Sequence, residues 1–113
     1  MRILHLEDSP QIQSMVKRIF GSQRCVLVSV STVVDAIAEM TREPRPDLFI
    51  SDWRLENETA RKAIEFAKDL AIPVLLFSGT PPADINVDLV VEKPCARADH
   101  ELLAGAEKLV VRN

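Results

Sequence analysis

The segment "LFISDWRLENETA", residues 48–60, decides how the rest of the chain is interpreted. Its first residues are apolar strand-formers, and this run stops abruptly at Asp52, after which the chain becomes polar. A carboxylate at the end of a buried strand has no obvious packing role. The surrounding sequence must therefore explain what kind of sheet places an acid there, and for what chemistry.

Strands and helices alternate on both sides of this segment. Further strands are expected at "RILHLED", "CVLVSV", "IPVLLFS" and "DLVVE", which are residues 2–8, 25–30, 72–78 and 88–92. Most segments between them carry apolar residues at helical spacing, such as Ile12, Val16 and Ile19. Strands that are apolar on both faces and alternate with helices predict a parallel sheet covered on both sides, which is the doubly wound α/β class.

Several helix ends are marked in the sequence. Ser9 is a candidate N-cap with Pro10 at the first helical position, and Gly21 is a candidate end for that helix. Thr32 is a candidate cap for the second helix, and residues 99–111 are expected to form the last one. The helix after Asp52 is predicted from one apolar face, made by Ala60, Ala63, Ile64, Ala67 and Leu70.

Composition excludes several functions. The 113 residues, 47% of them hydrophobic, suit one globular domain spanning residues 1–113. No apolar run approaches the roughly 20 residues that cross a bilayer, and no signal pattern is present, so we expect a cytoplasmic protein without a membrane partner. The net charge is −3 and no basic stripe exists, which argues against nucleic-acid binding. Cys25 and Cys95 lack metal or disulfide spacing and are expected to be reduced thiols.

Five polar residues are expected to gather at one edge of the sheet, because the carboxyl ends of parallel strands meet there. They are Glu7, Asp8, Asp52, Ser78 and Lys93. Three carboxylates so close together repel one another unless a cation is bound. An oxygen-only ligand set suits Mg²⁺, so Glu7, Asp8 and Asp52 are the candidate metal ligands.

The same edge suggests a reaction. Asp52 is the candidate nucleophile towards a phosphoryl group, with Lys93 and Mg²⁺ neutralising the developing charge and the Ser78 hydroxyl donating to one oxygen. The product is an aspartyl phosphate. His5 lies inside the first strand, away from these strand ends, and is interpreted as a satisfied, half-buried histidine rather than a ligand or base.

The four motifs "ILHLEDSP", "DLFISDW", "PVLLFSGT" and "VEKP", in this order, resemble the receiver domain of two-component response regulators over essentially the whole chain. The resemblance implies a flavodoxin-like sheet of order 2-1-3-4-5 and bacterial, cytoplasmic signal transduction by phosphorelay. It also implies a histidine kinase or phosphotransfer protein as donor, a downstream protein partner, and at most self-phosphorylation and self-dephosphorylation as enzymatic activity.

By this resemblance, Glu7 and Asp8 match the acidic pair that holds Mg²⁺, and Asp52 matches the phosphorylated aspartate. Ser78 matches the switch hydroxyl and Lys93 the phosphate-binding lysine. The bond between Lys93 and Pro94 is typically cis in the family.

The sequence departs from the family after Ser78. Only ten residues, 79–88 ("GTPPADINVD"), separate the fourth and fifth strands, which is too few for a helix and two loops. The fourth helix is therefore expected to be missing or reduced to a turn. Val90 occupies the position of the switch aromatic, and the loop after Asp52 lacks the family's proline and glycine.

The missing helix predicts an apolar patch over residues 74–77 and 89–91, and with it a possible homodimer through strands four and five. Alternatively, Ile85 and Val87 fold back and cover those strands.

Two functions stay open. The first is a stand-alone receiver phosphorylated on Asp52. The alternative is a pseudo-receiver that acts as a constitutive interaction or dimerisation module. An aspartyl phosphatase is disfavoured because Arg54 stands where such enzymes need a second acid, and flavin binding because the loop after the first strand is acidic.

Overall fold

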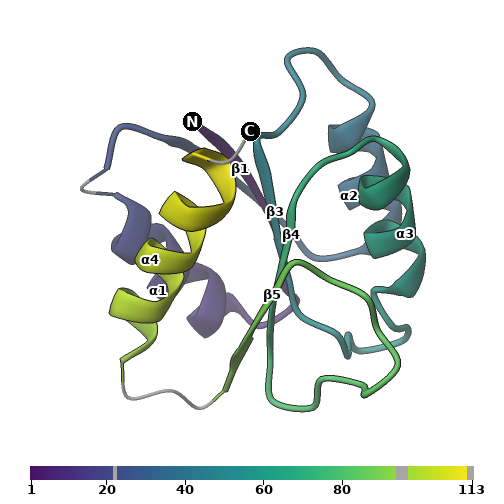
Figure 1. Cartoon of the computed structure of the whole chain (residues 1–113). Coiled ribbons are helices and arrows are strands. Elements are labelled where there is room, and N and C mark those ends of the chain that lie inside the picture. Colours follow the sequence, from purple (N-terminus) through teal and green to yellow (C-terminus); the bar gives the residue numbers. More distant parts are fainter. Residues whose placement is uncertain (22, 94–96, 112–113) are drawn as a thin grey trace.

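The computed structural model describes residues 1–21, 23–93 and 97–111, and these form one parallel five-stranded sheet with helices on both faces (Figure 1). The strand order is β2-β1-β3-β4-β5, which confirms the predicted flavodoxin-like class. The strands are β1 (Arg2–Leu6), β2 (Val26–Val30), β3 (Leu48–Ser51), β4 (Val74–Ser78) and β5 (Leu89–Glu92). The helices are α1 (Pro10–Phe20), α2 (Val33–Met40), α3 (Arg61–Asp69) and α4 (Ala98–Val111).

Helices α1 and α2 begin at the residues that the sequence predicted. The Ser9 side chain accepts a hydrogen bond from the amide of Ile12, and Pro10 opens α1. The Thr32 side chain accepts one from the amide of Asp35 at the start of α2. Both caps satisfy amides that have no partner within the helix, and so they fix where the loops after β1 and β2 end.

Each face of the sheet is covered by one pair of helices. Helices α1 and α4 lie on one side and α2 and α3 on the other, as Figure 1 shows. Alternate residues of a strand serve opposite layers, so Leu75 and Phe77 pack towards α1 and α4 while Val74 and Leu76 pack towards α2 and α3. A Cβ at Gly105 would lie 2.7 Å from a methyl carbon of Leu89, so the glycine allows α4 to lie close to the sheet.

The fourth helix of the receiver pattern is absent, as predicted. Residues 79–88, called the strap from here on, contain no helix and run from β4 to β5 on the same side of the sheet as α3 (Figure 1). Ile85 and Val87 of the strap are half-buried and pack against the core layer beneath α2 and α3. A short loop with two apolar side chains therefore does the covering that a helix does elsewhere.

The expected apolar patch is not present. The residues of β4 are all buried, with exposed fractions between 0% and 1%. Helices α1 and α4 cover one face of this strand, and the plug residues of the strap pack in the layer on its other face. In β5, Leu89 is half-buried, Val91 is buried, and only Val90 stands out with an exposed fraction of 42%. The basis for a homodimer through β4 and β5 is thus removed, and the alternative in which Ile85 and Val87 act as plugs is confirmed.

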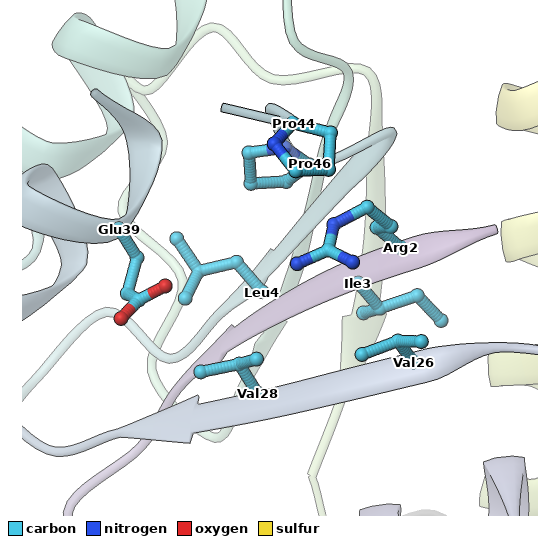
Figure 2. A pocket seen from close by; sticks show the side chains of 8 residues that line it. All are labelled: Arg2, Ile3, Leu4, Val26, Val28, Glu39, Pro44 and Pro46. Carbon is cyan, nitrogen blue, oxygen red and sulfur yellow. The ribbon is translucent and has the colours of Figure 1, made fainter. Parts of the chain in front are cut away.

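A small pocket lies at the opposite edge of the sheet from the strand carboxyl ends (Figure 2). Its volume is about 10 Å³, which is room for about one water molecule, so it is too small for a ligand. Its walls come from the starts of β1 and β2, the end of α2 and the loop before β3, and they comprise Arg2, Ile3, Leu4, Val26, Val28, Glu39, Pro44 and Pro46. Among the helices of the described residues, none has the length and apolar character needed to cross a membrane.

The plug residues supply the first prediction. Replacing both, Ile85→Ser with Val87→Ser, should lower the free energy of unfolding by roughly 2–3 kcal/mol and increase binding of a hydrophobic dye, because β4 loses its apolar cover. Chemical denaturation and dye fluorescence measure the two effects. Val90→Ser is the control, since this exposed side chain packs in neither core layer. Wild-type stability and unchanged dye binding in the double variant would contradict the covering role.

Candidate functional site

The five predicted site residues lie at the carboxyl edge of the sheet. Glu7 and Asp8 follow β1, Asp52 follows β3, Ser78 is the last residue of β4, and Lys93 follows β5. The backbone joins these strand ends directly, because the amide of Asp52 donates to the Leu6 carbonyl at 3.0 Å and the amide of Lys93 donates to the Ser78 carbonyl at 3.0 Å.

Three carboxylates meet at this edge. One oxygen from each of Glu7, Asp8 and Asp52 lies within 4.8 Å of the others. Glu7 is buried, and the two aspartates are half-buried. An open cavity of about 200 Å³ lies beside Asp8, between the loops that follow β1, β2 and β3. The carboxylates are thus close enough to share a cation and remain accessible from solvent on the Asp8 side.

The ammonium group of Lys93 bridges two of these carboxylates. Its Nζ lies 2.6 Å from Glu7 Oε1 and 3.1 Å from Asp52 Oδ2. The side chain of Lys93 is 16% exposed, and its Nζ also lies 5.1 Å from the centre of the Phe77 ring. One cation thereby connects the ends of β1, β3 and β5 in a partly desolvated setting, where such an interaction is stronger than at the surface.

Glu7 is held by groups from three parts of the chain. Besides Lys93, the Ser9 amide donates to Oε2 at 3.2 Å, and Gln13 Nε2 of α1 donates to the Glu7 backbone carbonyl at 2.5 Å. Burial raises the pKa of the Glu7 carboxyl above its usual range, and the hydrogen bond and charge of Lys93 hold part of that rise back. Lys93 therefore favours the ionised form of Glu7 against the effect of burial.

Asp52 is fixed through its own loop. Its Oδ1 accepts the amide of Trp53 at 2.7 Å, while Oδ2 faces Lys93. The loop closes on itself, since the Ala60 amide donates to the Trp53 carbonyl at 2.8 Å. Glu58 Oε2 then accepts the Val33 amide at the start of α2 at 3.1 Å. The loop is therefore rigidly placed although it lacks the family's proline and glycine.

Ser78 lies at the site edge but its hydroxyl has another partner. The residue is fully buried, and its Oγ accepts the amide of Thr80 at 3.2 Å. The hydroxyl thus secures the first turn of the strap. Its own proton is not used in that bond, so it is available to a group bound beside Asp52.

Some residues that shape the site were not found from the sequence. Gln13 and Phe77 hold Glu7 and Lys93, and Arg61 of α3 lies with its guanidinium carbon 5.0 Å from the centre of the Trp53 ring. Gln13 stands next to the apolar stripe of α1, which marks it as inward-facing, but the sequence does not reveal its partner. The predicted cis bond to Pro94 and the interpretation of Cys95 lie outside the described residues. Cys25 is a free thiol, as expected.

The interpretation of His5 was wrong. The residue is fully buried, and neither ring nitrogen has a hydrogen-bond partner among the described residues. Burial lowers the pKa of His5 to about 4, with a further lowering from the Lys93 charge and a smaller opposing effect from Asp52. His5 is therefore neutral near pH 7, and it lies close enough to the acidic edge to sense two of its charges.

Solved receiver domains have this architecture. The receiver domain of a signal transduction histidine kinase from Syntrophus aciditrophicus is 24% identical, with a TM-score of 0.84 and coverage of 98% of this chain and 90% of that chain. A CheY-like receiver domain protein from Methanospirillum hungatei is 18% identical, with a TM-score of 0.86 over 98% of this chain and 94% of that chain. The fold is therefore that of response regulator receiver domains in two-component systems.

A third structure includes a metal. The receiver domain of a sensor histidine kinase from Pseudomonas aeruginosa, with a magnesium ion coordinated in its active site cleft, is 17% identical, with a TM-score of 0.84 over 97% of each chain. No protein-family model matches this sequence, and no curated protein does so either. The resemblance to known receivers is thus carried by the fold rather than by overall sequence similarity.

The state of His5 supplies a pH prediction. A pKa of about 4 in the folded protein, against 6.5 when unfolded, means that the unfolded chain binds this proton first as pH falls. Burying His5 in its neutral form thus does not lower the free energy of unfolding above pH 6.5. As pH falls from 6.5 towards 4, protonation of His5 in the unfolded chain lowers it progressively. His5→Leu should remove this loss and raise the free energy of unfolding at pH 5 by about 2 kcal/mol relative to wild type.

Urea denaturation from pH 4 to pH 7 tests this prediction. Comparing the two proteins at each pH cancels the opposite contribution of Glu7, whose raised pKa adds stability as pH falls. His100→Leu is a matched control, because His100 is exposed on α4. Parallel pH profiles for wild type and His5→Leu would show that His5 is not buried in its neutral form.

Proposed function

We propose that residues 1–113 work as one receiver domain, acting in the cytoplasm, in which Asp52 accepts a phosphoryl group with Mg²⁺ as cofactor. The observation that carries this proposal is the contact of Lys93 with both Glu7 and Asp52 across the ends of three strands. A half-buried lysine between two carboxylates has no packing benefit of its own, and its ammonium stands where phosphoryl oxygens would need a counter-charge.

The donor set fits Mg²⁺. Glu7, Asp8 and Asp52 offer only oxygen ligands, and the open side at Asp8 leaves room for water, which Mg²⁺ usually retains. When bound, Mg²⁺ would neutralise charge on the phosphoryl oxygens. The magnesium-containing receiver from Pseudomonas aeruginosa supports this assignment.

The reaction is a transfer between two covalent partners. A carboxylate oxygen of Asp52 forms a bond to phosphorus while the bond from phosphorus to the donor breaks, and the leaving group keeps that electron pair. A histidine kinase or phosphotransfer protein is the proposed donor, with the imidazole of its phosphohistidine as the leaving group. Lys93 stabilises the charge on the transferred group, and the Ser78 hydroxyl donates a hydrogen bond to one of its oxygens.

A pseudo-receiver remains the second candidate, and one observation favours it. Val90 stands where receivers usually have an aromatic switch residue, and it is 42% exposed rather than packed. In that case the acidic edge stabilises the fold, and the domain acts by constant contact with a protein partner. The two candidates differ in whether Asp52 accepts phosphate.

Phosphorylation of Asp52 is directly testable. With Mg²⁺ and a small phosphodonor, such as phosphoramidate or acetyl phosphate, the wild type should gain the mass of one phosphoryl group that is labile to hydroxylamine. Asp52→Asn should gain none, and Asp47→Asn is a control on an exposed acid away from the site. Intact-protein mass spectrometry reads the result. An unmodified wild type in the presence of bound Mg²⁺ would favour the pseudo-receiver.

Metal affinity gives a separate prediction. Lys93→Met removes a positive charge within hydrogen-bonding distance of two proposed ligands, so Mg²⁺ should bind roughly tenfold more tightly while phosphorylation is lost. Titration followed by the fluorescence of Trp53 measures the affinity. Asp8→Asn should weaken binding, and Lys17→Met on the exposed side of α1 should leave it unchanged. Weaker Mg²⁺ binding in Lys93→Met would argue against a shared site for the two cations.

A further inference from the structure

The strap is attached to α3 by two polar contacts. Arg61 Nη2 lies 3.4 Å from Asp84 Oδ2, and Lys68 Nζ donates to the backbone carbonyl of Asn86 at 2.7 Å. Both contacts are exposed to solvent, so each contributes little to stability. The plug residues hold the strap over the sheet, and its polar contacts with α3 add little to this attachment.

Arg61 has a second partner that leads back to the site. Its guanidinium lies over the Trp53 ring, with 5.0 Å from the guanidinium carbon to the ring centre, and Trp53 is only 8% exposed. The amide of Trp53 in turn donates to Asp52 Oδ1 at 2.7 Å. A continuous series of contacts thus runs from Asp52 through Trp53 and Arg61 to Asp84 in the strap.

The beginning of the strap touches the site by another route. The Thr80 amide donates to the buried Ser78 hydroxyl, and the Lys93 amide donates to the Ser78 carbonyl. A group bound beside Asp52 that draws the Ser78 hydroxyl towards itself would weaken the bond to Thr80. The strap is therefore connected to the acidic edge both at its first turn and at its middle.

We propose that the strap is the element that changes when Asp52 is occupied, and that Arg61 is a positioning residue that couples the two. This inference rests on the proposed function. The fourth helix is absent and Val90 replaces the switch aromatic, so the usual structural route for a signal is missing from this chain. The Arg61 contacts supply an alternative route to a surface that solvent and a partner protein can reach.

The expected change has a direction. Occupation of Asp52 engages its carboxylate and the Ser78 hydroxyl, which weakens the bonds that Trp53 and Thr80 make to them. Because Arg61 lies over the Trp53 ring, a shift of Trp53 also weakens the contact of Arg61 with Asp84, so the strap loses connections at its first turn and at its middle. The amide of Asp88 at the end of the strap, which donates to the Val74 carbonyl at 3.1 Å, should therefore open more often in the occupied state.

Hydrogen exchange measured by mass spectrometry tests this, with Mg²⁺ and beryllofluoride as the phosphoryl mimic. In wild type, exchange of the Asp88 amide should be about tenfold faster with the mimic than without it, the effect of losing about one hydrogen bond. Arg61→Gln should give fast exchange in both states, so that the mimic adds less than about twofold. Lys62→Gln, an exposed neighbour on α3, is the matched control and should behave like wild type.

Two further variants separate coupling from simple structural damage. Arg61→Lys keeps the charge near Trp53 and Asp84 and should restore most of the difference between the two states. Asp84→Asn should resemble Arg61→Gln, and the double variant should add little to either, because both remove the same contact. Additive effects would mean that the two residues act independently and would overturn the proposed coupling.

Fluorine NMR of bound beryllofluoride distinguishes this inference from the proposed function. No bound signal in wild type, at any concentration, means that the phosphoacceptor assignment has failed. A bound signal that Asp52→Asn abolishes, together with unchanged exchange in the strap, leaves the phosphoacceptor standing and overturns the inference. The inference would also be overturned if the mimic accelerated exchange in the strap of Arg61→Gln as much as it does in wild type.

Discussion

The buried carboxylate of Glu7 is the constraint on which the rest of the site depends. With an exposed fraction of 2%, it needs a nearby cation or a proton, and Lys93 supplies the cation from the far edge of the sheet. That contact requires β5 to lie in register with β4 and the chain after β5 to turn inward over Phe77. Forming the ion pair thus selects a complete sheet, because the two partners are 86 residues apart in sequence.

The strap solves a packing problem in an unusual way. In the receiver pattern a helix covers β4 and β5, whereas here Ile85 and Val87 cover β4 with ten residues between the strands. The cover is thin, and β5 keeps an exposed side chain at Val90. A thin cover attached by one surface ion pair and one surface hydrogen bond is less stable than a packed helix, which suits the role that we propose for the strap.

Much of the fold could be predicted because its signals are local. Apolar runs indicated the strands, Ser9 and Thr32 marked two helix starts, and a ten-residue interval was sufficient to predict a missing helix. The candidate site also followed from strand ends, since a parallel sheet gathers them at one edge. His5 and the apolar patch were misjudged because burial depends on which residues cover a position. The contacts of Arg61 with Trp53 and Asp84 join segments distant in sequence, and no pattern within one segment predicts them.

The acidic edge and the strap place opposite demands on the same few residues. The edge must be rigid enough to hold three carboxylates within 4.8 Å of one another, and the short hydrogen bonds of Gln13 and Trp53 achieve this. The links between the strap and the site run through Ser78 and Arg61, which each have one partner on the site side and one on the strap side. Because each of these two residues belongs to both regions, the coupling that we propose between Asp52 and the strap needs no rearrangement of the sheet.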